Sequence, residues 1–202
     1  MKVVLASKNP HKLVEIQAIL SKLNIDVVLE SQLGVDIEVE ETGTTFEENS
    51  FLKANAVMKA TGLPALADDS GIAVDALNGE PGVYSARYGG DPSLNDWGRL
   101  LLLLHNMENV PDGQRTGRFV SVITLVYPNG RVIQARGEAE GEILREAHGQ
   151  GGFGYDPIFY YPPAGKTFAE LTAEEKNRVS HRARALRLFY DKMCEERNHA
   201  DK

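Results

Sequence analysis

Two adjacent carboxylates in the first half of the chain have the type and spacing of metal ligands. Asp68 and Asp69 follow the apolar run 63–67, and Ser70 and Gly71 come next. A short apolar run bounded by turn formers is typical of a buried strand, so we expect the strand to end at these acids. Like charges repel and burial disfavours ionisation, so the pair needs a partner. Mg²⁺, which takes carboxylate and phosphate oxygens, is one partner, and a solvated turn is the alternative.

A polar loop near the N-terminus is suited to binding an anion. Residues 7–12 (SKNPHK) separate a predicted strand at 3–6 from a predicted amphipathic helix at 13–23. The start of a helix presents free backbone N–H groups to an anion. The loop lacks the GxxxxGK(S/T) pattern of a P-loop, and a solvated connection that carries lysines is the alternative.

A glycine-rich stretch with two aromatic residues lies at 149–157 (GQGGFGYDP). Its glycines permit positive φ and allow a ligand to approach the backbone closely. Phe153 and Tyr155 could stack on a planar base, a contact worth about 1–3 kcal/mol. The alternative is a turn that aromatic packing holds in place.

Three basic side chains stand out near the C-terminus, and the histidine and the arginine among them could donate hydrogen bonds to carbonyl oxygens of a base. His181 and Arg182 lie five and six positions after Lys176, so a regular helix does not place them on the same face as Lys176. A shared ligand requires the helix to break near Ser180, or Lys176 to reach in. A solvated surface cluster is the alternative.

The elements that must position these groups alternate between strand and helix patterns. A strand is predicted at 27–29, and Thr45 with Glu48 fits a capping box that opens a helix ending at Gly62. Lys53 lies on that helix. Strands at 118–127 and 131–135 join through Asn129-Gly130, which predicts a hairpin and therefore a mixed sheet. Two more helical regions are predicted, one from about residue 93 to 104 and one, mostly helical, over 171–193.

Four residues of the helix that ends near residue 104 recur at helical spacing, and we assign them to the core: Trp97, Leu100, Leu101 and Leu104.

Composition limits the classes of protein that the chain can belong to. With 202 residues, 42% hydrophobic and 25% charged, it suits one globular domain over 1–202 that has two packed lobes and no linker. The net charge of −7 argues against general nucleic-acid binding. The single cysteine, Cys194, fits a reducing compartment. No apolar run is long enough for a signal peptide or membrane span, so a cytoplasmic protein is expected.

Five motifs in order make the sequence similar to the inosine triphosphate pyrophosphatase family of the Ham1/RdgB type. They are SKNPHK at 7–12, EETGTTFEENSFLKA at 40–54, LADDSGIAVDALNGEPGVYSARY at 66–88, GGFGYDPIF at 151–159 and EEKNRVSHRARAL at 174–186. One departure is visible: Ser7-Lys8 stands where the family usually has Thr-Gly. Serine keeps the hydroxyl, whereas Lys8 is bulkier than glycine in a phosphate loop.

The resemblance implies an α/β fold with a long mixed central sheet flanked by helices, two lobes with the nucleotide cleft between them, and a homodimer. It implies Mg²⁺-dependent hydrolysis of ITP, dITP and XTP to the monophosphate and pyrophosphate. Asp69 would be the general base, and Glu40, Asp69 and Asp68 would bind the metal. The implied substrate-binding residues are Ser7, Lys8, Asn9, Pro10, His11, Lys12, Lys53, Ser70, Phe153, Gly154, Tyr155, Asp156, Lys176, His181 and Arg182.

Two functions of other classes remain open on the sequence. A nucleotide-binding regulator would use the same loops without a general base. A phosphomonoesterase of the aspartyl-phosphate type would need a DxD pattern at a strand end, which Asp68-Asp69-Ser70 does not supply. Pyrophosphate as a product would indicate attack at the α-phosphorus, and orthophosphate would indicate attack at the terminal one.

Overall fold

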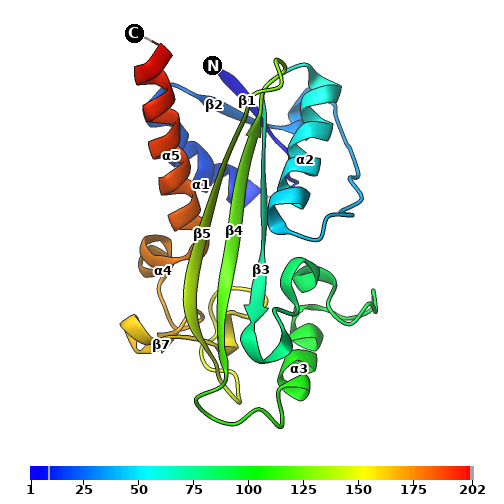
Figure 1. The fold of residues 1–202 in the computed structure, drawn as a ribbon, viewed down its shortest axis with the longest axis vertical. Helices are drawn as coiled ribbons and strands as arrows, with labels where there is room; N and C mark the ends of the chain where they lie inside the picture. Colours follow the sequence, from blue (N-terminus) through cyan, green and yellow to red (C-terminus); the bar gives the residue numbers. More distant parts are fainter. Residues whose placement is uncertain (9, 201–202) are drawn as a thin grey trace. The chain divides into compact units, whose positions relative to one another are not determined.

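The computed structural model describes residues 1–8 and 10–200, with the backbone alone at residues 10, 11, 15 and 197–200. Within these residues the strands are β1 (Lys2–Leu5), β2 (Asp26–Leu29), β3 (Ala65–Val74), β4 (Thr116–Val126), β5 (Val132–Ile143), β6 (Phe159–Tyr161) and β7 (Lys166–Thr167). The α-helices are α1 (Pro10–Leu20), α2 (Phe46–Thr61), α3 (Asp96–Asn106), α4 (Ala173–Val179) and α5 (His181–Ala200), and η4 (Gly82–Arg87) is a 3₁₀ helix (Figure 1).

The strands form one mixed sheet in the order β2-β1-β3-β4-β5-β6-β7. β1 pairs in parallel with β2 and β3, whereas β6 pairs antiparallel with β5 and β7. A tight turn joins β4 to β5: the Gly130 N–H donates to the Tyr127 carbonyl at 3.0 Å, and Gly130 has a φ of +85°. Glycine adopts this left-handed conformation without steric cost. The predicted mixed α/β sheet with flanking helices is confirmed.

The chain forms two compact units. Unit 1 comprises Met1–Asp69, Ser121–Gly137 and Arg184–Lys202, and unit 2 comprises Ser70–Val120 and Glu138–Ala183. Strands β3, β4 and β5 contribute residues to both units. The single domain and the cleft between two lobes stay predictions.

Unit 1 has three layers, with helices on both faces of its strands (Figure 1). Alternate residues of a strand point to opposite faces. Val3 and Leu5 of β1 therefore pack with α1 and α5 in one apolar cluster, while Val4 packs with Val57 of α2 in another. These two clusters hold α1 and α2 against opposite faces of the same strands.

Unit 2 has its own core, to which α3 contributes Leu100 and Leu103. The predicted core stripe of this helix was partly wrong, because Trp97 is 52% exposed and Leu101 is 47% exposed. The stripe that faces the core runs through Leu100, Leu103 and Met107, at spacings of three and four. Trp97 and Leu101 are one turn apart on a neighbouring, exposed face.

The helix ends follow their local sequence signals. Thr45 caps α2, because its Oγ1 accepts from the Glu48 N–H at 3.1 Å, and Gly62 ends the helix with a φ of +67°. The break between α4 and α5 falls at Ser180, whose extended backbone has a ψ of 156°. The predicted capping box is confirmed. The segment predicted as mostly helical over 171–193 is divided at Ser180, which is one of the two conditions that a ligand shared by Lys176, His181 and Arg182 requires. No helix in the described part of the chain is long and apolar enough to cross a membrane.

Two neighbouring residues of α5 test the packing of unit 1. Phe189 is fully buried in the cluster with α1, whereas Leu188 is 49% exposed. We expect Phe189→Ala to lower the free energy of unfolding by about 3–5 kcal/mol, because it leaves a cavity. Leu188→Ala should change it by less than about 0.5 kcal/mol. Urea denaturation measures both, and equal losses would contradict the assignment of Phe189 to the core.

Candidate functional site

The acidic pair lies inside a strand rather than at its end. β3 runs without interruption from Ala65 to Val74, through Asp68, Asp69, Ser70 and Gly71. The predicted strand end at the acids was therefore wrong. The composition suggested a turn, but each carboxylate has partners from other elements, so the backbone can stay in the sheet.

Asp68 is a buried carboxylate with two firm contacts. Lys12 Nζ of α1 lies 2.8 Å from its Oδ2, and Ser121 Oγ of β4 donates to its Oδ1 at 2.7 Å. Leu66, two residues earlier, packs into the cluster that contains α1. Asp68 thus points to the α1 face of the sheet, where the predicted phosphate loop meets the helix.

Asp69 points to the opposite face, toward α2. Lys53 Nζ lies 2.6 Å from Asp69 Oδ1 and 2.9 Å from Glu41 Oε1. Asp69 Oδ2 is buried and has no hydrogen-bond partner among the described residues. One oxygen of this carboxylate is therefore fixed by a cation while the other is free to bind a ligand or a water molecule.

The surroundings of Asp69 change its acidity. Burial raises the pKa of the Asp69 carboxyl, and Glu41 adds to that effect, while Lys53 opposes it. Burial pulls the pKa of Lys53 down, but the two carboxylates outweigh it, so the Lys53 pKa is raised. Asp69 is therefore a stronger base than an ordinary aspartate, beside an ammonium that stays charged.

The predicted metal ligands are only partly brought together. Glu40 is exposed, whereas its neighbour Glu41 reaches the cluster of Lys53 and Asp69. No group of three or more His, Cys, Asp or Glu side chains arranged for a metal occurs among the described residues. Sequence reasoning missed Glu41 because adjacent acids in an irregular segment give no periodicity that would select one of them.

The predicted phosphate loop contributes one side chain to these contacts. Lys12 reaches Asp68, while Lys8 forms an exposed ion pair with Asp36 at 2.6 Å. Ser7 is half-buried. Asn9 lies outside the described residues, and the backbone of Pro10 and His11 forms the first turn of α1.

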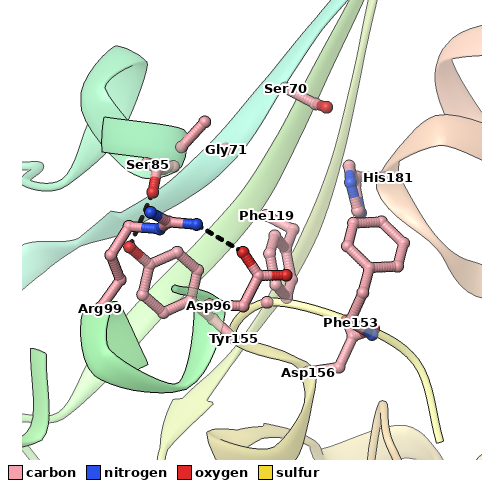
Figure 2. Close-up of a pocket in the computed structure, with 12 residues that line it drawn as sticks. Ser70, Gly71, Ser85, Asp96, Arg99, Phe119, Phe153, Tyr155, Asp156 and His181 are labelled. Atoms are coloured by element: carbon pink, nitrogen blue, oxygen red, sulfur yellow. Dashed lines mark hydrogen bonds and ion pairs between the residues drawn. The ribbon is translucent and has the colours of Figure 1, made fainter. Parts of the chain in front are cut away.

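Unit 2 contains a pocket of about 140 Å³. For comparison, a protein cavity of about 150 Å³ binds a benzene ring, so the pocket is of the size of one aromatic ring. Figure 2 shows aromatic rings and a few polar groups around it. The lining residues are Ser70, Gly71, Ser85, Ala86, Asp96, Arg99, Phe119, Phe153, Gly154, Tyr155, Asp156 and His181. Six of these were predicted from the sequence: Ser70, Phe153, Gly154, Tyr155, Asp156 and His181.

Asp156 organises the glycine-aromatic stretch. It is 2% exposed, and its Oδ2 accepts from the Phe153 N–H at 2.8 Å and from Lys176 Nζ. The Lys176 ammonium lies 4.8 Å from the centroid of the Phe153 ring, which is 63% exposed. Phe153 therefore offers an open aromatic face at the pocket, with a cation beside it.

The helix break at Ser180 brings His181 to the pocket. Its ring is buried and stacks on Phe119, with 4.8 Å between centroids and 13° between planes. Lys176 contacts the pocket through Phe153 and Asp156, while the half-buried Arg182 does not line it. The Lys/His part of the predicted basic set is thus assembled in unit 2.

Six residues of the pocket were not predicted as site residues: Gly71, Ser85, Ala86, Asp96, Arg99 and Phe119. Arg99 of α3 pairs with Asp96 at 2.6 Å, and both face the pocket (Figure 2). Tyr155, predicted to stack on a base, is buried and donates its hydroxyl hydrogen to the Ser85 carbonyl at 2.8 Å. Gly71, Ser85 and Ala86 lie inside the motif at 66–88 without having been selected as site residues, whereas Asp96, Arg99 and Phe119 lie outside the five motifs and reach the pocket on separate elements.

Asp68 and Asp36 form a matched pair of aspartates, each with a lysine partner. We expect Asp68→Asn to lower the free energy of unfolding by about 2–3 kcal/mol at pH 7, because it breaks a buried ion pair and leaves Lys12 without its counter-charge. Asp36→Asn, which breaks an exposed pair with Lys8, should have little effect. Urea denaturation of both variants checks this, and equal stabilities would refute a structural role for the Asp68 pair.

The pKa of Asp69 can be moved in both directions. Lys53→Gln removes the nearby cation and should raise it, whereas Glu41→Gln removes a nearby anion and should lower it. Carboxyl ¹³C chemical shifts of Asp69, followed against pH without added metal, measure the pKa directly. A change of the Asp69 pKa in the same direction in both variants would contradict this geometry.

The chain was compared with protein families and with known proteins. The Ham1 family model matches residues 3–192. A dITP/XTP pyrophosphatase of Salmonella paratyphi A is 51% identical over 192 residues, covering 94% of this chain and 96% of that protein. A dITP/XTP pyrophosphatase of Thermus thermophilus is 52% identical over 191 residues, covering 95% of this chain and 91% of that protein.

Solved structures agree with the sequence matches. The Ham1 protein of Staphylococcus aureus has a TM-score of 0.90 and 41% identity, covering 97% of this chain and all (100%) of that one. A HAM1 protein of Coxiella burnetii has a TM-score of 0.91 and 44% identity, covering 96% and 99%. The predicted family is confirmed, and the chain belongs to the Ham1 family.

Proposed function

We propose that the protein is a Mg²⁺-dependent nucleoside triphosphate pyrophosphohydrolase that converts ITP, dITP and XTP to the monophosphate and pyrophosphate. The names of the bacterial relatives support the reaction and two of the substrates. The observation that carries the proposal is the Asp69 carboxylate, with one oxygen held by Lys53 and the other free among the described residues. A regulator that only senses a nucleotide has no need for such a poised base.

In the proposed step Asp69 takes a proton from water, and the water oxygen attacks the α-phosphorus. The bond between the α-phosphorus and the bridging oxygen breaks, and pyrophosphate leaves with its electron pair. Phosphoryl transfer depends on positioning and on neutralising charge. Lys53, beside Asp69, would supply fixed positive charge to the phosphates, and the resemblance implies the same role for Lys12, which pairs with Asp68.

The carboxylates of unit 1 fit a magnesium ion. Mg²⁺ is held in proteins by one or two carboxylates together with waters and substrate phosphates, so a large protein cage is not required. Asp69 would hold the ion with Glu40, as the resemblance implies, or with Glu41, which already lies at the cluster. When bound, Mg²⁺ neutralises phosphate charge and lowers the pKa of bound water.

The pocket of unit 2 would take the base. The exposed face of Phe153 suits stacking, and His181, which lines the pocket, would donate to the C6 carbonyl oxygen of hypoxanthine or xanthine. The resemblance implies Arg182 as a second donor, which would have to reach in from outside the lining. Adenine has an amino group at that position and leaves these donors unpaired, which a polar site rejects strongly. Guanine shares the C6 oxygen, so its 2-amino group must cause its rejection.

Pyrophosphate release from dITP, XTP, dATP and dGTP, each with Mg²⁺ or EDTA, tests the proposal. We expect metal-dependent release from dITP and XTP and little from the other two. Equal turnover of all four would remove the selectivity role of His181 and Arg182. Orthophosphate in place of pyrophosphate, or no product from folded protein, would refute the proposed reaction.

Asp69→Asn separates an enzyme from a binding protein. We expect kcat for dITP to fall by roughly 100-fold or more, because the general base is lost. Binding of dITP, measured by calorimetry in Ca²⁺ to suppress turnover, should remain. A variant that still turns over at the wild-type rate would exclude Asp69 as the base.

A further inference from the structure

Ser85 joins three segments of unit 2 at the base pocket. It lies in η4, is buried, and lines the pocket together with Ser70, Gly71 and Tyr155. None of the expected base or phosphate contacts involves it. Figure 2 shows Ser85 beside Gly71, with the hydrogen bond from Tyr155 reaching it.

The side chain of Ser85 holds η4 against β3. Its Oγ accepts from the Ile72 N–H at 2.9 Å and donates to the Gly82 carbonyl at 2.7 Å. A Cβ at Gly71 would lie 2.4 Å from Ser85 Oγ and 2.5 Å from the Gly82 oxygen. Only glycine permits this approach, which occurs directly after Ser70 in the strand.

The backbone of Ser85 holds the glycine-aromatic stretch. Its carbonyl accepts from the Tyr155 hydroxyl at 2.8 Å, and both residues are buried. Burial raises the pKa of Tyr155, so the hydroxyl remains a donor at neutral pH. The next residue, Asp156, holds the Phe153 N–H and Lys176. A continuous set of contacts therefore runs from β3 through Ser85 and Tyr155 to the exposed ring of Phe153.

We propose that Ser85 is a positioning residue for the base pocket, and that the Tyr155 hydroxyl acts through it to fix the stretch that carries Phe153. This inference rests on the proposed function for its substrate. Tyr155 then serves the pocket by anchoring its wall, and stacking on the base falls to Phe153. Without the anchor, part of the binding free energy would be used to order this stretch, so substrate binding weakens while the chemical step is kept.

Two variants remove the two sets of hydrogen bonds at Ser85. Tyr155→Phe removes the hydrogen bond from the Tyr155 hydroxyl and leaves the buried Ser85 carbonyl without it. Ser85→Ala removes the hydrogen bonds of Ser85 Oγ to Ile72 and Gly82. We expect each to raise KM for dITP roughly fivefold to tenfold, the effect of losing one buried hydrogen bond, with kcat changed by less than about twofold. Amide hydrogen exchange should become faster at Phe153 in Tyr155→Phe and at Ile72 in Ser85→Ala.

Tyr88→Phe is the matched control. Tyr88 is buried in the same core and its hydroxyl oxygen accepts from Asn106 Nδ2 at 2.7 Å, but it does not line the base pocket. It should leave KM and the Phe153 exchange rate unchanged. A KM for Tyr155→Phe within twofold of this control would overturn the inference.

The same experiment separates this inference from the proposed function. Wild-type protein that releases no pyrophosphate from dITP would refute the function alone. Amide hydrogen exchange would then test the positioning role by itself. Faster exchange at the Phe153 amide in Tyr155→Phe than in Tyr88→Phe supports the role of Ser85 and Tyr155, and equal rates overturn it.

Discussion

The pleat of β3 allows two adjacent aspartates to lie in the interior of a sheet. Because successive side chains point to opposite faces, Asp68 and Asp69 meet different helices and each obtains its own lysine. The sheet itself thus separates like charges that would otherwise repel. The two carboxylates differ in consequence: Asp68 is held at both oxygens, by Lys12 and Ser121, whereas Asp69 keeps one oxygen open.

Apolar packing keeps this arrangement in place. Lys12 and Lys53 lie on α1 and α2, and each helix is fixed to its face of unit 1 by a separate buried cluster. In unit 2 a third buried acid, Asp156, plays a comparable part, because it gathers Lys176 and the backbone of the glycine-aromatic stretch. A buried carboxylate with a lysine partner thus recurs at each group of predicted site residues.

Features that depend on a few neighbouring residues could be predicted from the sequence. The Thr45 cap and the turn at Gly130 are of this kind, since the signal and the structure occupy the same short stretch. The continuation of β3 through its acids was not predictable in this way. It depends on Lys12, Lys53 and Ser121, which lie far from β3 in the sequence.

The same reasoning explains which parts of the candidate site were found. The motifs identified the residues that their own segments carry to the pocket, such as Phe153 and His181. Ser85 lies inside the motif at 66–88 and Arg99 outside the motifs, but both reach the pocket through the packing of η4 and α3, which neighbouring residues alone do not predict. The exposed position of Trp97 was missed because helical spacing alone does not fix which of two neighbouring faces turns inward.

Hydrolysis of dITP in ¹⁸O-labelled water tests the central claim most directly, namely that water attacks the α-phosphorus. Mass spectrometry of the products shows which phosphorus receives the oxygen. Label in the monophosphate, with none in pyrophosphate, is the predicted result. Label in the pyrophosphate would place the attack on the β-phosphorus and contradict the proposed reaction.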